Sequence, residues 1–366
     1  MSDSFPLTLL HWFAENGREL PWRGTRNPYA IWLSEIILQQ TRVQQGWHYW
    51  ERFMSHWPTV QQLAAATEDE VLREWQGLGY YSRARNLHAA AKQIAERGSF
   101  PDTYEEIRQL KGVGDYTAAA IASMAFDLPH AVVDGNVYRV LARHYGIHTP
   151  INTTEGKKEF ALLAQQLLPA GKAAAYNQAI MDFGAIQCTP QSPRCLLCPL
   201  QESCTALRQG LVDQLPVKLK TLQVRERRLA YIYIRCSSAE DRQQGRSPLT
   251  AIRRRGAGDI WQGLWEPVPM TDDIMKLLTA SNAEDITKQL TAGNAESSPR
   301  LQLIKQSFRH VLTHRILLCD FYLLETSERP TLPPDYQWVS EDQLDRYAFP
   351  RMLELLFGLL PPPAKQ

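Results

Sequence analysis

Apolar residues recur every three or four positions from Leu7 to about Leu207, and strand-like alternation is almost absent from this part of the chain. This spacing is typical of helices that bury one face, so it predicts an all-α region. Helix starts are marked by proline or by a capping residue, and Gly98 and Gly146 mark two helix ends. The predicted helices include Tyr29–Val43, Thr103–Leu110, Tyr116–Phe126 and Val137–Tyr145.

The pattern changes after a basic stretch. Helical periodicity fades between about residues 208 and 228, where five basic side chains after residue 217 face one acid, Glu226, which indicates a basic linker. A second, mixed α/β domain begins near residue 229. Its predicted strands are Leu229–Ile234, Leu249–Ile252 and Ile316–Leu324. Its predicted helices are Asp272–Leu278, Ala283–Leu290 and Ser340–Leu344, the last with Ser340 and Gln343 at capping-box spacing.

Composition narrows the class of protein. With 366 residues, 44% of them apolar and 22% charged, the chain suits about two globular domains. Its 40 basic and 39 acidic residues nearly cancel, so local basic patches would have to hold any polyanionic partner. No apolar run approaches the roughly 18 residues that a membrane span needs, and the N-terminus resembles no export signal. We therefore expect a soluble, cytoplasmic protein.

Four of the six cysteines fall in one short stretch, at the spacing Cys188-x6-Cys195-x2-Cys198-x5-Cys204. In a large chain without an export signal, such clustering favours a metal site over disulfides. Four thiolates at close quarters repel one another and need a cation. Zinc and a [4Fe–4S] cluster both accept four cysteines, so this reasoning leaves both open.

A glycine turn and two carboxylates stand out in the helical region. The turn Leu110-Lys111-Gly112-Val113-Gly114-Asp115 joins two predicted helices, and its glycines leave backbone N–H groups free to hold a phosphate. Asp134 directly precedes a helix, where aspartate is most often an N-cap. Glu35 has apolar neighbours, so burial would raise its pKa and suit it to general acid catalysis, although an exposed or ion-paired glutamate is the commoner case. Glycoside hydrolysis uses such a pair, one acid and one anion.

Together these motifs resemble those of the endonuclease III and MutY branch of the helix–hairpin–helix DNA glycosylases. The cysteine spacing resembles that branch's cluster loop, and the hairpin followed by Asp134 resembles the superfamily signature. The run Gly77-Leu78-Gly79-Tyr80-Tyr81-Ser82-Arg83-Ala84-Arg85-Asn86-Leu87 is nearly diagnostic of MutY-type adenine DNA glycosylases. The resemblance is strong over about residues 5–225 and weak over 229–355.

The resemblance implies a fold and its divisions. A mainly α catalytic region with an iron–sulfur cluster loop would occupy residues 1–207, and a C-terminal α/β Nudix-like domain for lesion recognition would occupy 229–360, after the linker at 208–228. Within the catalytic region it implies a six-helix barrel at about 22–129 and an iron–sulfur subdomain formed by 1–21 and 130–207.

The resemblance also implies roles for matching residues. Glu35 would protonate adenine at N7, and Asp134 would stabilise or transiently trap the sugar cation. Tyr116 and Asn136 would be further catalytic residues. All four clustered cysteines, Cys188, Cys195, Cys198 and Cys204, would hold one structural [4Fe–4S] cluster that shapes a basic loop around Arg194.

DNA contacts follow from the same resemblance. Because the reacting nucleotide must leave the duplex, Gln40 and Tyr80 would fill the emptied stack. The resemblance also implies an adenine pocket, and its candidate residues are Arg18, Trp22, Arg23 and Asp182. For these adenine-pocket candidates, a buried tryptophan and surface arginines remain an equally good interpretation. The residues expected to contact DNA or a base are Arg18, Trp22, Arg23, Gln40, Tyr80, Gly112, Val113, Gly114, Asp182, Thr313 and His314.

One position separates the MutY type from endonuclease III. Bifunctional members place a lysine two residues after the last glycine of the hairpin, where its amine forms a Schiff base with the sugar. Here that residue is Tyr116, and Lys111 lies on the other arm of the turn. This predicts a monofunctional glycosylase of base excision repair that removes adenine mispaired with 8-oxoguanine or guanine. The alternatives are an endonuclease III-like glycosylase/lyase for oxidised pyrimidines and a lesion-binding protein without catalysis.

The second domain favours the same interpretation. Nothing after Gly263-Leu264-Trp265-Glu266 resembles the metal-binding helix of active Nudix enzymes, so recognition rather than hydrolysis is expected. Leu312-Thr313-His314 stands where the family has Phe-Ser-His, which keeps a hydroxyl and a histidine but lacks the aromatic residue. His310 and His314 could instead form a metal site, yet no third ligand lies near them in the sequence.

The implied partner is double-stranded DNA with an adenine:8-oxoguanine or adenine:guanine mispair. Replication or mismatch-repair proteins are candidate partners through the linker of a monomeric, nucleoid-associated protein.

Overall fold

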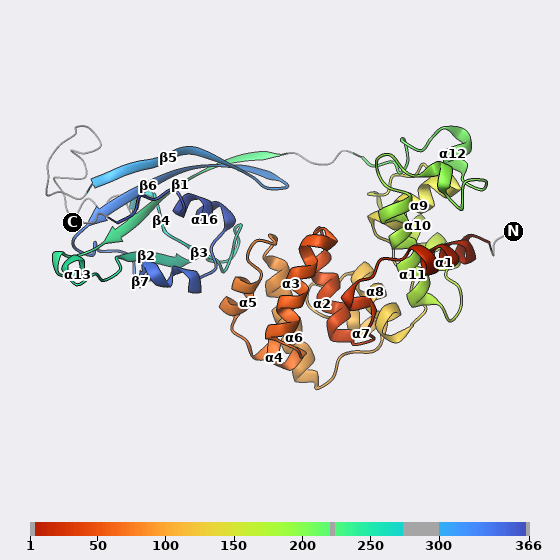
Figure 1. Ribbon diagram of the computed structural model, residues 1–366, viewed down its shortest axis with the longest axis horizontal. Helices are drawn as coiled ribbons and strands as arrows, with labels where there is room; N and C mark the ends of the chain where they lie inside the picture. The colour runs from red at the N-terminus through yellow and green to blue at the C-terminus, as the bar shows by residue number, and fades with distance from the viewer. Residues whose placement is uncertain (1–3, 220–223, 274–299, 364–366) are drawn as a thin grey trace. The chain divides into compact units, whose positions relative to one another are not determined.

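The structure is a computed structural model that describes residues 4–219, 224–273 and 300–363 (Figure 1). The chain packs as two compact units, one formed by residues 1–66 and 85–221 and the other by residues 67–84 and 222–366. The domain boundaries inferred from the sequence, 1–207, 208–228 and 229–360, stay predictions. The predicted helix at 283–290, and all of 272–278 except its first two residues, lie outside the described ranges. Within those ranges no helix is long and apolar enough to cross a membrane.

Helices build the chain up to residue 209, as the apolar spacing predicts. Capping residues set several starts: the Asn27 side chain accepts from the Tyr29 N–H at 3.0 Å, and Gly146 ends another helix in the left-handed conformation. The elements are α1 (Ser4–Asn16), η1 (Pro21–Arg23), α2 (Pro28–Leu38), α3 (Val43–His56), α4 (Val60–Ala65), α5 (Glu68–Glu74), α6 (Ser82–Arg97), α7 (Tyr104–Arg108), α8 (Asp115–Phe126), α9 (Gly135–Tyr145), α10 (Thr154–Gln166), α11 (Ala173–Asp182), the π-helical turn η2 (Phe183–Gln187), η3 (Cys195–Leu197) and α12 (Thr205–Gln209).

One long predicted helix, Tyr29–Val43, is wrong in its C-terminal part. The structure ends α2 at Leu38 and starts α3 at Val43, because Gln40 takes a positive φ of 56° that a right-handed helix cannot accommodate. The two helices then pack closely, since a Cβ at Gly46 of α3 would lie 2.6 Å from a Leu38 methyl. The break places an exposed glutamine between the buried helix α2 and the largely exposed helix α3.

A seven-stranded sheet forms the core of the second unit. Its path is β3-β2-β1-β6-β5, with β4 paired to β1 and β7 to β2. The central pair, β1 and β6, runs parallel with Arg225 opposite Arg315, whereas β5 pairs antiparallel to β6 as an edge strand. The strands are β1 (Arg225–Cys236), β2 (Leu249–Arg254), β3 (Trp265–Glu266), β4 (Val268–Pro269), β5 (Arg300–Val311), β6 (Arg315–Thr326) and β7 (Tyr336–Ser340).

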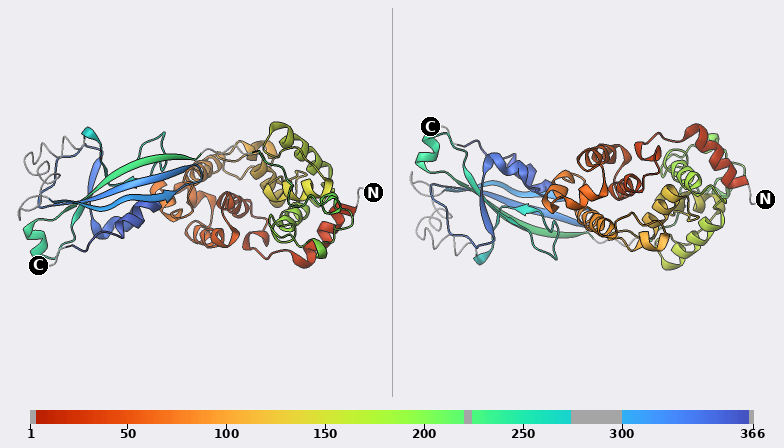
Figure 2. Two further views of the ribbon diagram at one scale, coloured as in Figure 1. Left: turned by 90° about the horizontal axis from the view of Figure 1, so that it is seen from above. Right: turned by 90° about the horizontal axis from the view of Figure 1, so that it is seen from below.

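Short helices flank this sheet. They are α13 (Ala239–Gln243), η4 (Glu341–Arg346) and α16 (Arg351–Phe357). Figure 2 shows the ribbon from two further sides. Met352 and Leu356 of α16 are buried in one apolar cluster with Phe321 of β6. The predicted helix at Ser340–Leu344 is a 3₁₀ turn, and the Ser340 side chain forms no cap hydrogen bond, so the predicted capping box is wrong. The three predicted strands are confirmed inside longer ones, while β5, β7 and α16 have no counterpart in the sequence prediction.

Candidate active site

Glu35 is a buried carboxyl group on α2. Every residue from Tyr29 to Ile37 is buried, and Glu35 is only 8% exposed. Burial raises the pKa of Glu35 to about 7, a hydrogen bond from Tyr116 and the charge of Arg23 oppose the rise, and the charge of Asp134 adds to it. The sequence expectation of a desolvated acid is therefore confirmed, and near neutral pH Glu35 is poised to give up a proton.

Asp134 caps α9, and both oxygens of its carboxylate accept hydrogen bonds. One of its carboxylate oxygens accepts from the backbone N–H groups of Asn136 and Val137, at 2.9 and 2.8 Å, and the other accepts from the Asn136 side chain at 2.7 Å. Burial raises the pKa of Asp134 above its usual value, and these hydrogen bonds work against the rise. The N-cap role expected of Asp134 is confirmed, and its part in the reaction stays a prediction for this partly buried carboxylate.

The two carboxyl groups belong to one site although almost a hundred positions separate them. The charge of Asp134 acts on Glu35, and both groups raise the pKa of the buried Tyr116 hydroxyl well above its usual range, after the larger effect of burial. The same hydroxyl donates to the Met181 sulfur at 3.5 Å. Tyr116 on α8 therefore interacts electrostatically with an acid from α2 and with an acid from the start of α9, and hydrolysis of a glycosidic bond uses a pair of such acids.

Arg139 connects this site to the cysteine loop. Its guanidinium donates to the Asn136 side-chain oxygen at 2.9 Å, to the Gly184 carbonyl at 2.6 Å and to the Cys188 carbonyl at 2.7 Å. The close approach depends on glycine, because a Cβ at Gly184 would lie 2.7 Å from the Asn136 Cβ. Arg139 thus orients the amide that holds the Asp134 carboxylate. The sequence analysis assigned it no role, although its spacing of five residues from Asp134 on one helix was visible.

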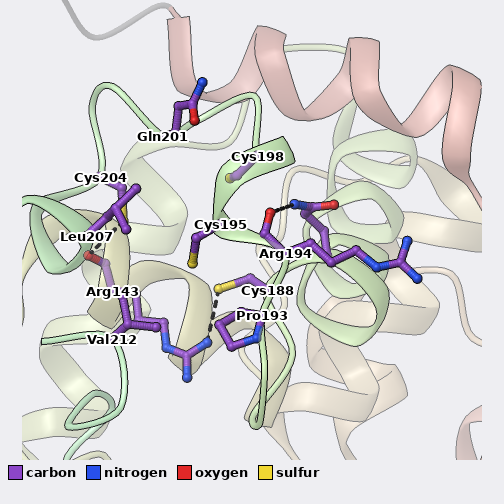
Figure 3. Close-up of a pocket in the computed structure, with 11 residues that line it drawn as sticks. Arg143, Cys188, Pro193, Arg194, Cys195, Cys198, Gln201, Cys204, Leu207 and Val212 are labelled. Atoms are coloured by element: carbon purple, nitrogen blue, oxygen red, sulfur yellow. Dashed lines mark hydrogen bonds between the residues drawn. The ribbon is translucent and has the colours of Figure 1, made fainter. Parts of the chain in front are cut away.

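The four cysteines of the loop line one cavity (Figure 3). Arg143 donates to the Cys188 sulfur at 3.4 Å and to the carbonyls of Thr189 and Pro190, which fixes the first thiol. Burial raises the pKa of Cys198 to about 11, and the charges on the other three cysteines add to this. A cationic group between the thiols would relieve both effects. In the described ranges no three ligating side chains are arranged to hold a single metal ion.

The predicted hairpin is present between α7 and α8. Gly112 has a φ of 79°, and a Cβ there would lie 2.7 Å from Asn86, so this position requires glycine. Val113 is buried, and Gly114 stands at the N-cap of α8 without a side-chain cap. The first N–H groups of α8 therefore lack a side-chain partner at the cap and can donate hydrogen bonds to an anion.

The adenine-pocket candidates form a tight ionic group. Asp182 is fully buried, and its carboxylate accepts from the guanidinium groups of Arg18 and Arg23 and from the Arg18 backbone N–H at 2.9 Å. Trp22 is 6% exposed and packs edge-on against Trp47 and Trp50. What the structure shows is an aspartate that orients two arginines, and a direct contact of Asp182 with a base stays a prediction.

We expect Asp182→Asn to lower the free energy of unfolding by about 2–4 kcal/mol, because it leaves two partly buried guanidinium groups without their counter-charge. The arginines hold the pKa of Asp182 below its usual value. The stabilisation that Asp182 contributes to the fold is therefore fully present above the ordinary aspartate pKa. It is lost as the pH falls through the lowered pKa of Asp182 in the folded protein. Denaturant unfolding at several pH values measures this, with exposed Asp102→Asn as the control. A pH-independent difference would contradict the ionic explanation.

Both residues predicted to fill an emptied base stack have unusual backbones. Gln40 is exposed with a φ of 56°, and Tyr80 is 42% exposed with a φ of 48°. Non-glycine residues rarely take positive φ values, and such strain concentrates at functional positions. In the second unit the Tyr80 hydroxyl hydrogen-bonds the hydroxyl of Thr313, and both Thr313 and His314 are exposed at the β5–β6 turn.

Three stretches of the chain match known families. Residues 33–168 match the HhH-GPD superfamily of base excision DNA repair proteins, residues 188–204 match the iron–sulfur binding domain of endonuclease III, and residues 242–357 match the NUDIX domain. The second match, together with the four thiols around one cavity, makes the loop a [4Fe–4S] cluster-binding site, and the four clustered cysteines stay its predicted ligands. Of the two groups that the spacing alone left open, the match supports the iron–sulfur cluster.

Several known proteins similar to this chain are DNA glycosylases. An adenine DNA glycosylase of Mus musculus is 44% identical over 227 residues, which are 58% of this chain and 44% of that protein. The adenine DNA glycosylase of Buchnera aphidicola subsp. Schizaphis graminum is 36% identical over 234 residues, which are 63% of this chain and 67% of that protein. A solved thermostable thymine-DNA glycosylase is 31% identical with a TM-score of 0.53, over 56% of this chain and 95% of that one. The chain spans less than half the length of the mammalian relatives.

Proposed function

Because this chain belongs to the adenine DNA glycosylase family, we propose that it removes adenine mispaired with 8-oxoguanine or guanine in double-stranded DNA, as a step of base excision repair. The observation that carries this proposal is the pair formed by Glu35, whose pKa burial raises to about 7, and the partly buried Asp134, because the charges of both groups act on Tyr116. The Arg18–Asp182–Arg23 group and Trp22 supply a polar and aromatic wall for the base.

In the proposed reaction the bond between C1′ of the sugar and N9 of adenine breaks. Glu35 donates a proton to N7, which makes adenine a neutral leaving group. Asp134, held by Asn136 and through it by Arg139, stabilises the positive charge that develops at C1′ or traps it transiently. Water then adds to C1′ and loses a proton, which leaves an abasic site.

Other groups would bind and position the DNA. The hairpin at residues 112–114 and the loop around Arg194 lie where backbone N–H groups and positive charge favour phosphates. Gln40 and Tyr80 would occupy the space that the flipped nucleotide leaves. Thr313 and His314 would read the 8-oxoguanine strand. The thiolates of Cys188, Cys195, Cys198 and Cys204 would hold the [4Fe–4S] cluster, and their bonds to iron would cross-link the loop that carries them. A monomeric state, and contacts with replication or mismatch-repair proteins through residues 208–228, remain part of the proposal.

Single-turnover assays on three 30-base-pair duplexes test the function. We expect loss of adenine opposite 8-oxoguanine and opposite guanine, and no reaction when 8-oxoguanine faces cytosine. Strand cleavage should require later alkali, because Tyr116 stands where a Schiff-base lysine would be. Borohydride trapping of the protein on the DNA would support an endonuclease III-like lyase instead. Tight binding of the mispair without any base release would support a lesion-binding protein.

A further inference from the structure

The segment 255–264 of the second unit, here called the Asp259 loop, has a fixed backbone. It is closed at its base by the Arg255 N–H donating to the Leu264 carbonyl at 2.8 Å and by the Gly263 N–H donating to the Arg255 carbonyl at 2.9 Å. The Arg255 side chain crosses the loop and donates to the Ile260 carbonyl at 3.1 Å. These hydrogen bonds leave the loop little freedom to rearrange.

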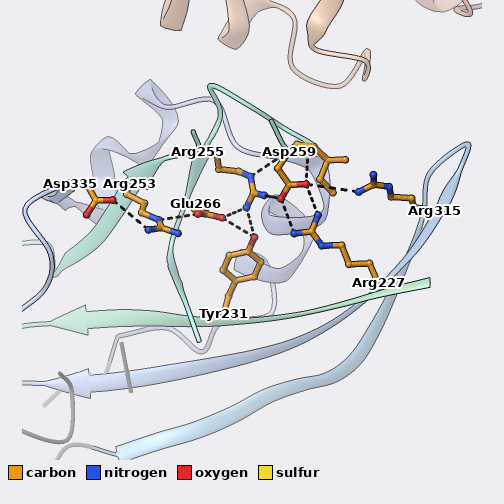
Figure 4. A network of polar contacts seen from close by, with 9 residues as sticks. Arg227, Tyr231, Arg253, Arg255, Asp259, Glu266, Arg315 and Asp335 are labelled. Atoms are coloured by element: carbon orange, nitrogen blue, oxygen red, sulfur yellow. Dashed lines mark hydrogen bonds and ion pairs between the residues drawn. The ribbon is translucent and has the colours of Figure 1, made fainter. Parts of the chain in front are cut away.

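Asp259 anchors this loop to the two central strands (Figure 4). Its carboxylate accepts from Arg227 of β1 at 2.7 Å and from Arg255 at 2.8 Å, and Arg315 of β6 lies 3.9 Å away. The hydrogen bonds from Arg227 hold the pKa of Asp259 at about 2, so the carboxylate stays charged at physiological pH. Arg315 directly follows His314, so the same ionic group fixes the loop beside the turn that carries Thr313.

Trp261 is the strained residue that this loop holds. Its φ is 61°, a left-handed value that a bulky side chain rarely adopts. Among the described residues, two other large side chains with positive φ are Gln40 and Tyr80, the pair expected to enter the base stack. A strained conformation persists only where the surroundings over-determine it, and such positions concentrate at binding sites. Here the Asp259 loop provides that constraint.

The indole of Trp261 is half-buried. It packs on the same apolar cluster as Leu312, with the Arg255 guanidinium 5.8 Å and the His310 ring 6.4 Å from its centre. Thr313, the residue after Leu312, is exposed. The arginines around the loop add positive charge, which suits a polyanion.

We propose that Trp261 is a DNA-binding residue. The exposed part of its indole stacks on a base of the strand that carries 8-oxoguanine, and Asp259 is its positioning residue. This inference rests on the proposed function and adds a contact to it. Aromatic side chains bind displaced bases by stacking, without reading their hydrogen-bonding edges. Selectivity for the lesion would remain with Thr313, whereas Trp261 would add affinity at the mispair.

Binding of two 30-base-pair duplexes tests the inference. One duplex carries 8-oxoguanine opposite 2′-fluoro-2′-deoxyadenosine, whose fluorine destabilises the sugar cation and prevents excision, and the other is fully matched. Trp261→Ala should weaken binding to the mispaired duplex about tenfold and binding to the matched duplex hardly at all. The dependence of affinity on salt should not change, because stacking releases no counterions. Trp261→Phe should restore most of the loss.

Two further variants separate stacking from packing. Trp261→Leu keeps an apolar contact with the core but has no aromatic face, so it should show the same loss as the alanine variant. Asp259→Asn should lose part of the preference for the mispair because the loop is no longer held by its charge. Trp338→Ala is the matched control, since Trp338 is also half-buried with an arginine 5.8 Å from its ring.

The outcomes are distinguishable. If the unaltered protein binds both duplexes equally, the proposed function fails. If it prefers the mispair and both Trp261→Ala and Trp261→Leu keep that preference, Trp261 only packs and the inference is overturned. A leucine variant that matches the wild type while the alanine variant is merely less stable would overturn it as well.

Discussion

Asp134→Asn is expected to lower the single-turnover rate of adenine excision by at least about 10³-fold, while binding of the mispaired duplex changes little. The substitution removes the negative charge that is proposed to face the developing sugar cation. It barely alters the helix, because asparagine is as good an N-cap as aspartate and its oxygen can still accept from the Asn136 and Val137 N–H groups. The loss should therefore appear in the chemical step, as about 4 kcal/mol of transition-state stabilisation.

Asp127→Asn provides the matched control for this charge removal. Asp127 ends α8 in a left-handed conformation that asparagine tolerates, and its carboxylate also accepts a backbone N–H, from Ala174 at 3.2 Å. This variant should excise adenine at the wild-type rate. Equal rates for Asp134→Asn and Asp127→Asn would show that the Asp134 charge takes no part in the reaction. A large loss of thermal stability in Asp134→Asn alone would point to the cap instead.

The sequence was informative where a residue's environment is local. Nine consecutive buried residues on α2 are visible as an apolar run, so the burial of Glu35 and the direction of its pKa shift could be predicted. Asp134 as an N-cap follows from its place before a helical pattern, and the hairpin glycines follow from the backbone they permit. These predictions needed only the nearest few residues and are confirmed.

Contacts between distant segments could not be predicted in this way. Asp182 and Arg18 are 164 positions apart, and nothing near either residue indicates that Arg18 and Arg23 share one buried carboxylate. The same holds for Arg139, whose partners at Gly184 and Cys188 lie 45 and 49 positions away, within and directly after the π-helical turn that follows α11. Such contacts depend on packing, and the apolar periodicity of a sequence records which face is buried but not against which partner.

The edge strand β5 was missed for a related reason. Register shifts between Leu303 and Phe308 interrupt its pairing with β6, and Ser307 takes a positive φ of 48° there. Three consecutive residues, 305–307, are exposed, so the alternation expected of a strand is broken. An irregular edge of this kind resists further strand pairing.

The rate of adenine excision is expected to fall as the pH rises through about 7, and Glu35→Gln is expected to excise adenine about 10²- to 10⁴-fold more slowly at pH 7. Glu35 must be protonated to act as an acid, and burial, aided by the charge of Asp134, raises its pKa to about 7. Since two interacting carboxyl groups titrate together, the descending limb of the rate profile belongs to the Glu35–Asp134 pair. Single-turnover rates between pH 5.5 and 9 measure this limb, which should vanish in Glu35→Gln.

The stability of Glu35→Gln should change in the opposite direction to its activity. A carboxyl whose folded pKa lies above its unfolded value of 4.5 binds more protons in the folded state, so it destabilises the fold progressively as the pH rises from 4.5 to about 7. Glu35→Gln should therefore melt higher than the wild type at pH 8 and by a smaller margin at pH 5. Exposed Glu70→Gln is the control, because a capping box accepts either residue at that position. An inactive Glu35→Gln that melts lower than the wild type at pH 8 would mean that Glu35 holds the fold together rather than storing a proton for the base.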